Sequence, residues 1–525
     1  MAPWWQHATI YHVYPRSFQD SDGDGVGDLE GIRRRLPYLS WLGVDAVWLS
    51  PIYRSPMADF GYDVSDHTDV EPLFGRLEDF DRLAAEAHSL GLRLILDYVP
   101  NHTSAEHPWF QDARAGGAHR DWYLWRDGSR ESPPNNWVSS FGGPAWTWDE
   151  QVGAWYYHAY LPEQPDLNWR NPEVRAAMGE VMRFWLERGV DGFRIDALRQ
   201  AMKDAQWRDN PPNPDWREGD DPYQALLPVF SADQPDVAEV VRVLRDAVDA
   251  AQAADGRERV LIGELYLPIE RLMAYYGYGI DLPANFHLLQ TAWTAPELGA
   301  LVDIYEAALP DGAWPNWVLS NHDRPRVATR VGAPQARAAA VLLLTLRGTP
   351  TLYYGDELGL ADVPVPPERE QDPWGLRVPG HGRDGARTPM QWDAGPNAGF
   401  TDPDAEPWLP LSDDADVRNV AAQREDPDSM LALHRDLLSL RRSEPALQVG
   451  DHRTVAAEGG ILVYERAHDD RRVVVALNLG EDAAEVRLDG LSGTVALGSE
   501  RGRARQRIVG AATLAPGEAI VVRRD

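Results

Sequence analysis

Four apolar segments of the sequence carry acidic side chains at or near their ends, a pattern that would suit a cluster of catalytic carboxylates. GVDGFRIDAL places Asp196 two residues after Arg194, RVLIGELY reaches Glu264, and NWVLSNHDR reaches Asp323, whereas RLILDYVPNH contains Asp97. Paired carboxyl groups can act as nucleophile and as general acid or base, and a neighbouring guanidinium group favours the ionised form. A structural ion pair is the alternative explanation for any one of these segments taken alone.

The segments between the acids predict how they are brought together. Short continuous apolar runs are typical of strands buried on both faces of a parallel sheet, and helical segments such as 29–42 and 77–90 separate them. In a (β/α)₈ barrel the carboxyl ends of all strands open onto one face. We therefore predict an α/β fold with a TIM barrel in which the acids share one pocket. The expected strands are 8–14, 44–49, 92–99, 190–195, 260–263, 280–286, 317–320 and 351–354.

The alternation of strand and helix is interrupted twice in the chain. From about 101 to 170 the composition shifts to Trp, Pro, Gly and His, which indicates a subdomain inserted after the third strand. After a helix around 430–442 the pattern becomes the alternation typical of an antiparallel sheet. We expect the barrel in residues 1–100 and 171–450, the inserted subdomain in 101–170, and a C-terminal antiparallel β-sandwich in 451–525.

The composition limits the classes of partner. A formal net charge of −31 argues against binding to nucleic acid or to an anionic membrane, because both require a basic face. The sequence has no cysteine, which excludes disulfides and thiol catalysis. The N-terminal residues lack a basic region followed by an apolar core, and no apolar run approaches the length of a membrane span. We expect a cytoplasmic monomer or homodimer that acts on a neutral small molecule.

The segment DSDGDGVGD predicts a cation site near the N-terminus. It places carboxylates on alternate positions with glycines between them, so the chain can surround a hard cation such as Ca²⁺ or Mg²⁺. The segment is not an EF-hand, because its twelfth position is Gly31 rather than Glu. An acidic, glycine-rich turn is the alternative. The predicted ligands are Asp20, Asp22, Asp24, the carbonyl group of Val26, and Asp28.

Six motifs carry a resemblance to a known family. DYVPNH, GFRIDA, GEL and NHD, in this order, resemble the four signature segments of the α-amylase family of retaining α-glycosidases. QPDLN at 164–168 and RTPMQW at 387–392 resemble the oligo-1,6-glucosidase and α-glucosidase subgroup of that family. The resemblance spans nearly the whole chain and implies a barrel, a subdomain inserted after the third strand and a C-terminal β-sandwich.

The resemblance also implies a role for each matching residue. Asp196 is similar to the nucleophile, Glu264 to the acid/base and Asp323 to the third carboxylate, which binds sugar hydroxyls. Two such carboxyl groups in a retaining enzyme are roughly 5–5.5 Å apart. We expect Arg194 to keep Asp196 ionised while Glu264 holds a proton. The implied substrate-binding residues are Arg194, His102, His322, the stacked ring of Tyr62, the aromatic walls Phe141 and Tyr160, and Asp59 with Arg387 as a pair that closes the far end of the pocket.

These roles predict an exo-acting retaining α-glucosidase, because a closed pocket leaves no path for a long chain. The expected substrates are maltose, short malto- or isomalto-oligosaccharides and sucrose, with transglucosylation as a side activity and no cofactor for catalysis. In the subgroup, a small residue at the position of Ala197 accompanies α-1,4 preference and a valine accompanies α-1,6. Two alternatives stay open: a sugar isomerase of the sucrose or maltose/trehalose type with the same acids, and a non-enzymatic barrel such as the heavy chain of an amino-acid transporter.

Overall fold

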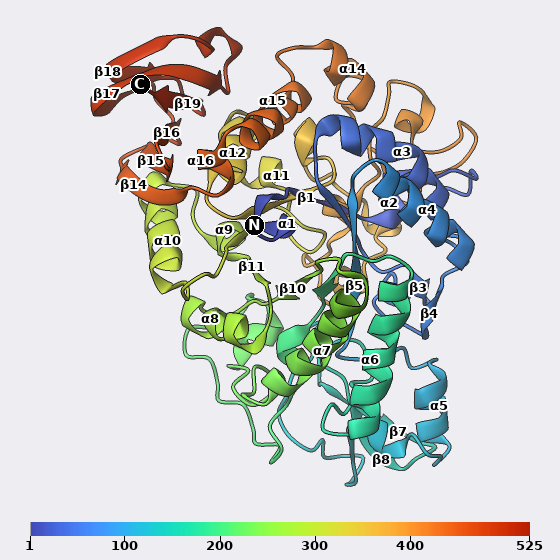
Figure 1. The fold of residues 1–525 in the computed structure, drawn as a ribbon. Helices are drawn as coiled ribbons and strands as arrows, with labels where there is room; N and C mark the ends of the chain where they lie inside the picture. The colour runs from blue at the N-terminus through green and yellow to red at the C-terminus, as the bar shows by residue number, and fades with distance from the viewer. Residues whose placement is uncertain (1) are drawn as a thin grey trace.

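Eight parallel strands close into a barrel in the computed structural model, which describes residues 2–525 (Figure 1). Their order around the barrel is β1-β13-β12-β11-β10-β9-β5-β2, so the first and last strands of the barrel pair and close it. The predicted TIM barrel is confirmed, and each expected strand overlaps an observed one. The strands are β1 (Ile10–Val13), β2 (Ala46–Leu49), β5 (Arg93–Tyr98), β9 (Gly192–Ile195), β10 (Val260–Glu264), β11 (Leu282–Asn285), β12 (Asn316–Val318) and β13 (Thr349–Tyr353).

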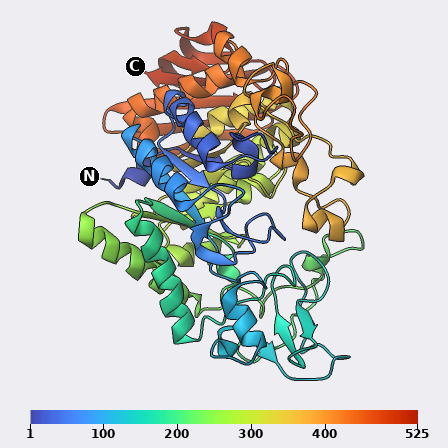
Figure 2. The same ribbon diagram turned by 90° about the vertical axis from the view of Figure 1, so that its right-hand side faces the viewer.

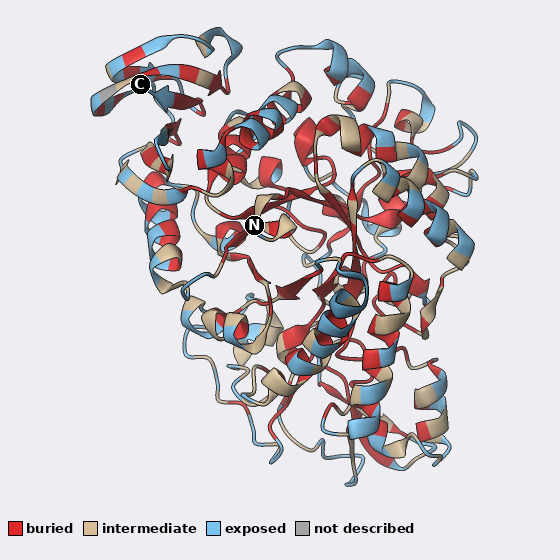
Figure 3. Ribbon diagram, viewed as in Figure 1, coloured by how far each residue is buried: buried red, intermediate tan, exposed pale blue. Residues whose placement is uncertain are grey.

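The barrel strands are buried on both faces, as their continuous apolar runs predict. One set of side chains, with Ile95 and Ile262 among them, packs in a cluster inside the barrel. The alternate residues, such as Leu94 and Leu261, pack in the large cluster that includes residues of the surrounding helices. Figure 3 shows the result: the strands are buried, and the helices expose only their outer faces.

The helices that surround the barrel begin and end where local signals predict. Helix α3 (Leu29–Leu42) begins after Asp28, whose carboxylate accepts a hydrogen bond from the Gly31 amide, and ends at Gly43 with φ of 100°. The other long helices are α4 (Leu77–Ser89), α6 (Pro172–Glu187), α7 (Val237–Asp255), α8 (Ile269–Tyr278), α10 (Ala295–Ala308), α12 (Ala333–Thr345) and α15 (Met430–Ser443). No helix in the described part of the chain combines the length and the apolar character that crossing a membrane requires.

Residues between β5 and α6 form a small sheet of their own. Strands β6 (Trp125–Arg126), β8 (Ala154–Tyr157) and β7 (Trp146–Asp149) pair in that order, and Trp146, Trp155 and Tyr157 belong to a separate apolar cluster. The buried ammonium group of Lys203 contacts Asp166 and donates to Asn101 Oδ1 at 2.8 Å, which fixes this region to the barrel. In Figures 1 and 2 the region lies at the opposite end of the molecule from the C-terminal sheet.

The C-terminal strands form one continuous six-stranded antiparallel sheet, in the order β14-β15-β16-β19-β17-β18. The long strand β17 changes register near its middle, and apolar residues from several strands of the sheet meet in one cluster that includes Val463, Val486 and Ile508. The sandwich is therefore built from a single sheet that folds on itself. Its strands are β14 (Asp451–Glu458), β15 (Ile461–His468), β16 (Arg471–Asn478), β17 (Ala484–Gly498), β18 (Arg507–Leu514) and β19 (Ala519–Arg524).

Candidate active site

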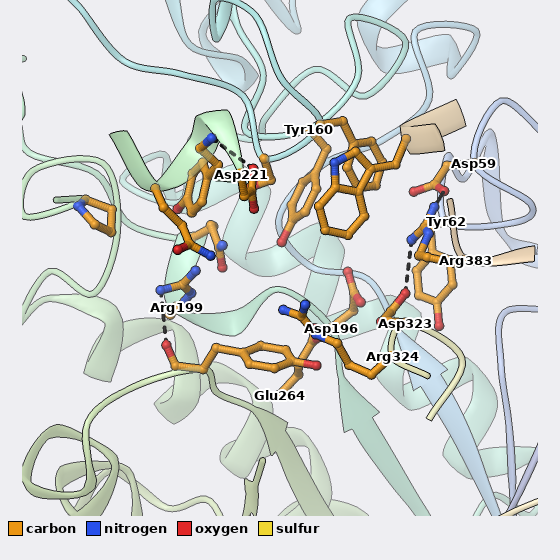
Figure 4. Close-up of a pocket in the computed structure, with 18 of the residues that line it drawn as sticks. Asp59, Tyr62, Tyr160, Asp196, Arg199, Asp221, Glu264, Asp323, Arg324 and Arg383 are labelled. Atoms are coloured by element: carbon orange, nitrogen blue, oxygen red, sulfur yellow. Dashed lines mark hydrogen bonds and ion pairs between the residues drawn. The ribbon is translucent and has the colours of Figure 1, made fainter. Parts of the chain in front are cut away.

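A cavity of about 340 Å³ opens at the carboxyl ends of the barrel strands. Asp196 follows β9, Glu264 ends β10, and Asp323 follows β12, and all three line this cavity (Figure 4). The structure therefore brings together three acids that are widely separated in sequence, as the barrel geometry predicts.

One buried guanidinium group organises the centre of the cavity. Arg194 Nη1 donates to Asp97 Oδ1 at 2.8 Å and to Asp196 Oδ1 at 2.7 Å, and Nη2 lies 3.1 Å from Glu264 Oε1. These residues belong to the neighbouring strands β5, β9 and β10 or follow them directly. The backbone amide of Ala197 also donates to Glu264 Oε2, at 2.9 Å. Asp196 and Glu264 are thus fixed side by side against one arginine.

The pKa of Asp196 is shifted in the direction opposite to the effect of Arg194 alone. Burial raises the pKa of Asp196 well above its usual value, the nearby Glu264 raises it further, and Arg194 lowers it only in part. Burial therefore disfavours the ionised form of Asp196, and Arg194 offsets this effect only in part.

The inner end of the cavity, defined by Asp59, Tyr62, His102, His322, Asp323 and Arg383, is closed by ion pairs. Arg383 donates from Nη2 to Asp59 Oδ1 at 2.8 Å and from Nη1 to Asp323 Oδ1 at 3.0 Å. Burial alone would raise the pKa of the Asp323 carboxyl group. Its neighbours His322, Arg383 and Arg387 together outweigh burial and hold that pKa well below its usual range. Asp323 is therefore ionised in the free cavity.

The predicted pairing of Asp59 with Arg387 is wrong. Arg383 takes that position, whereas Arg387 lies behind it, donates from Nε to the His322 carbonyl oxygen at 2.8 Å and from Nη2 to Asp323 Oδ1 at 3.2 Å. Both arginines belong to the segment GRDGARTPMQW, four positions apart. The sequence could not show which of the two arginines pairs with Asp59. The turn between them places Arg383 at the cavity and Arg387 behind it, and this turn could not be predicted from residue type.

The two predicted histidines lie at the inner end as neutral rings. The Tyr62 hydroxyl and His322 Nε2 are 2.7 Å apart, and the two rings stack with centroids 5.3 Å apart. His102 Nε2 lies 3.1 Å from the Tyr62 carbonyl oxygen. Burial lowers the pKa of His322 well below its usual value and that of His102 to about 3. Neutral imidazoles can bond sugar hydroxyls without adding charge.

Aromatic side chains form the wall between the centre and the mouth of the cavity. Phe141 and Tyr160 both line it, with ring centroids 5.6 Å apart. Trp374, from the short helix α13 (Pro373–Arg377), stacks on Phe141 at 5.7 Å and was not predicted. The predicted residues Arg194, Ala197 and Arg387 do not line the cavity: Arg194 and Arg387 support residues that do, and Ala197 is buried beside the nucleophile position.

The outer end of the cavity is formed by residues of the loop 199–228 after β9, together with Tyr266, Gln290 and Arg324. None of these residues was predicted. The loop contains only short pieces of regular structure, such as the 3₁₀ turn Pro222–Ala225, and its sequence has no periodic signal. Arg324 directly follows the predicted Asp323, which is the one sequence signal that could have drawn attention to it.

Three of the predicted cation ligands lie close together. Carboxylate oxygens of Asp20, Asp22 and Asp28 are within 4.8 Å of one another, whereas Asp24 is not part of this group. Asp20 Oδ1 also accepts hydrogen bonds from the amides of Asp22 and Gly23, at 2.9 and 2.8 Å. An all-oxygen donor set of this kind suits a hard cation such as Ca²⁺. The segment does not line the cavity.

Fold and site together define a (β/α)₈ barrel with three carboxyl groups around one cavity at the carboxyl ends of its strands. Residues 12–450 match the family model described as alpha amylase, catalytic domain, and the chain belongs to this family, which confirms the predicted membership. A probable alpha-glucosidase of Rhizobium meliloti is 42% identical over 500 residues, which cover 92% of this chain and 90% of that protein.

Solved structures agree over the full length. The alpha-glucosyl transfer enzyme XgtA is 40% identical with a TM-score of 0.93, and all of both chains is covered. The trehalulose synthase MutB of Pseudomonas mesoacidophila is 32% identical with a TM-score of 0.90 over all of both chains. The prediction of an α-glucosidase-like glycoside hydrolase agrees with these relatives. The trehalulose synthase among them agrees with the predicted sugar-isomerase alternative.

Proposed function

We propose that the protein is an exo-acting retaining α-glucosidase that releases glucose from the non-reducing end of short α-glucosides. The observation that carries this proposal is the pair Asp196 and Glu264, bonded to the two terminal nitrogens of Arg194 at the open side of a pocket whose inner end is closed. Two adjacent carboxyl groups are what double displacement at an anomeric carbon requires.

The reaction follows from the position of each group. Asp196 attacks the anomeric carbon as a carboxylate, and Glu264 gives a proton to the departing glycosidic oxygen, so a glucosyl ester forms on Asp196. Glu264 then removes a proton from water, which attacks the same carbon and frees glucose with its α configuration retained. Asp323 stays ionised and can accept hydrogen bonds from sugar hydroxyls as positive charge develops on the ring.

The closed inner end supports exo-action. Asp59 and Arg383 form a buried ion pair there, with side chains 5% and 7% exposed. A glucose unit bound against this pair has no space beyond it for a further sugar. A long polysaccharide therefore cannot pass through, and only a terminal glucose reaches the carboxyl pair.

Incubation with maltose, isomaltose, sucrose and trehalose tests the activity. We expect glucose from at least maltose, released first as the α anomer in a proton NMR time course, with glucosyl transfer to a second sugar as a side product. The appearance of rearranged disaccharides alone, without glucose, would contradict hydrolysis and favour the isomerase alternative, which the likeness to a trehalulose synthase supports.

We infer α-1,4 preference from Ala197 and the subgroup resemblance. Kinetics of Ala197→Val on maltose and isomaltose test this inference: the ratio of kcat/KM values should move toward isomaltose. A ratio that stays the same contradicts the use of Ala197 as a marker of linkage.

We also propose a structural Ca²⁺ or Mg²⁺ at Asp20, Asp22 and Asp28. Chelation should lower the thermal midpoint, and added Ca²⁺ should restore it, because a ligand that binds only the folded state stabilises it. The variant Asp22→Asn should respond less to added Ca²⁺, and an unchanged response contradicts the site. The cytoplasmic location and the monomeric or homodimeric state stay predictions.

A further inference from the structure

Two arginine side chains at the outer end of the cavity differ from those elsewhere in the site. Arg194, Arg383 and Arg387 each contact at least one carboxylate. No carboxylate whose position the structure describes lies within 4.0 Å of the guanidinium group of Arg199 or Arg324. Both groups point into the same part of the cavity, beside Asp196 and Glu264 (Figure 4).

Arg324 is positioned by stacking rather than by an ion pair. Its guanidinium carbon lies 5.4 Å from the ring centroid of Tyr266. Tyr266 in turn stacks on Phe286, with centroids 4.3 Å apart and planes 10° apart, and its hydroxyl accepts a hydrogen bond from Asn321 Nδ2 at 3.3 Å. Stacking occupies the face of a guanidinium group and leaves the N–H donors at its edge available to a planar acceptor.

Arg199 approaches the same space from the loop after β9. It donates one hydrogen bond, from Nη1 to the Tyr266 carbonyl oxygen at 3.1 Å, and its side chain is half-buried. A guanidinium group has five N–H donors, so most of its donors have no partner among the described residues. Tyr266 therefore positions both arginines, one through its ring and one through its backbone.

The negative groups that face these arginines are few. Asp221 lines the outer end, and its Oδ1 accepts a hydrogen bond from the Tyr223 amide at 3.0 Å. Glu264 also faces this end, but the proposed reaction requires it to be protonated when substrate binds. Asp196 also borders this space and is a carboxylate in the proposed reaction, so the outer end is distinguished not by its net charge but by two guanidinium groups that contact no carboxylate of the described residues.

We propose that the outer end binds an anionic group, a carboxylate or a phosphate, on the sugar that leaves or accepts glucose. The protein therefore prefers α-glucosides whose second unit is acidic. This inference rests on the proposed glucosidase function, and it adds the chemical class of the second unit. Arginine pairs with carboxylate and phosphate through two parallel hydrogen bonds, which a neutral hydroxyl cannot match.

Matched substrates test the preference. Maltobionate and maltitol carry the same open-chain second unit and differ only in a carboxylate in place of a hydroxymethyl group. Maltose with a phosphate on carbon 6 of its reducing glucose, compared with maltose, gives the phosphate arm. We expect kcat/KM to be about tenfold or more higher for at least one acidic substrate than for its neutral partner, as charge-assisted hydrogen bonds are stronger than neutral ones. The arm that responds identifies the anion.

Arginine variants test the assignment of the site. In Arg324→Gln and Arg199→Gln the ratio of acidic to neutral kcat/KM should fall by about tenfold for each charge-assisted hydrogen bond that the substitution removes. Arg377→Gln is the matched control: Arg377 is exposed on α13 and does not line the cavity, so it removes the same charge near the site without touching the substrate. A ratio that falls equally in the control indicates only long-range attraction and overturns the site.

Two readouts separate failure of this inference from failure of the proposed function. Hydrolysis of 4-nitrophenyl α-glucoside and maltose without any preference for the acidic substrates overturns the inference and leaves the glucosidase function in place. If no glucoside is cleaved, calorimetric titration with gluconate and with sorbitol still decides the binding question. Gluconate should bind more tightly to the wild type than sorbitol does, and Arg324→Gln should remove the difference; equal affinities overturn the inference.

Discussion

The inner and outer ends of the cavity are built on opposite electrostatic principles. At the inner end each guanidinium group is bonded to a carboxylate, and Asp59 and Arg383 are almost fully buried. At the outer end Arg199 and Arg324 are half-buried and lack such partners. The guanidinium group of Arg383 at the inner end is therefore paired with carboxylates before substrate binds. The guanidinium groups at the outer end still have hydrogen-bond donors available to a substrate. The inner end suits one fixed sugar, and the outer end suits a choice among second units.

The backbone origins of the two ends match this division. The centre comes from strand ends and the residues that follow them directly, and strands hold side chains within a rigid frame. At the inner end, His322 and Asp323 follow β12 closely, whereas Asp59 and Arg383 come from loops that their buried ion pair holds together. Much of the outer end comes from the loop 199–228, where little regular structure forms. Pre-organised charges at the centre need no rearrangement when charge develops in the transition state.

The centre, which both ends share, should give the largest effect. Asp196→Asn removes the nucleophile and should lower kcat by about 10⁴-fold or more, a loss typical of removing a group that acts in covalent catalysis. The loss should be the same for acidic and neutral α-glucosides, measured by glucose release. A decrease confined to one substrate class would place Asp196 in recognition rather than in the reaction.

Lys203 tests whether the inner end depends on the region inserted after β5. Its ammonium group contacts Asp166, and both side chains are at most 2% exposed. Lys203→Met leaves a buried carboxylate without its cation, which should lower the free energy of unfolding by about 3–5 kcal/mol in urea denaturation. The double variant Lys203→Met with Asp166→Asn should recover part of this loss, since no uncompensated charge remains. Equal losses in the two variants would contradict an electrostatic role.

The sequence predicts the centre and the inner end of the cavity far better than the outer end, for a physical reason. Asp196, Glu264 and Asp323 could be predicted because the period of buried strands and the rule that parallel strands end on one face fix where they meet. The arginine that pairs with Asp59 shows how far such a prediction reaches. An arginine was correctly expected, but Arg383 takes the place predicted for Arg387, because a turn decides which side chain faces the cavity. Arg199 lies three residues after Asp196, so its position was a signal, but no local pattern shows that Asp221 and Tyr223 of the same loop return to line the cavity beside it.

Arg383→Lys compares the two ends directly. The lysine keeps the positive charge but lacks the planar guanidinium group, whose two terminal nitrogens donate to Asp59 and to Asp323 at the same time. We expect kcat/KM to fall by about 10- to 100-fold for every glucoside, whether its second unit is acidic or neutral, because only the terminal glucose touches this end. Arg324→Gln should instead change the ratio between substrates. If both variants changed the ratio, the division into two ends would be wrong.

The backbone at Ala197 joins the centre to the outer loop. Ala197 has φ of 48°, in the left-handed region, and its amide donates to Glu264. A β-branched residue is strained in this region, so Ala197→Val should cost about 1–3 kcal/mol of unfolding free energy. Ala197→Gly is the matched control and should not be destabilised by strain, because glycine adopts this φ freely. Similar losses for both variants would show that packing of the methyl group, not backbone strain, dominates.

The smallest effect concerns the acid side of the pH profile, and it tests whether the centre titrates independently of the inner end. Asp196 must be ionised to attack, and burial raises its pKa. Activity should therefore rise with increasing pH through a pKa above the ordinary value for aspartate of about 3.9. Asp323 does not produce this limb, because its pKa is held below the usual range and it stays ionised. In the proposed reaction Glu264 is protonated while Asp196 is ionised, so Glu264→Gln replaces one neutral group by another and should leave the acid limb of kcat/KM in place. The measurement uses 4-nitrophenyl α-glucoside, whose leaving group departs without a general acid. An acid limb that moves to lower pH in Glu264→Gln would mean that Glu264 carries a negative charge while Asp196 ionises, and its assignment as the proton donor would be wrong.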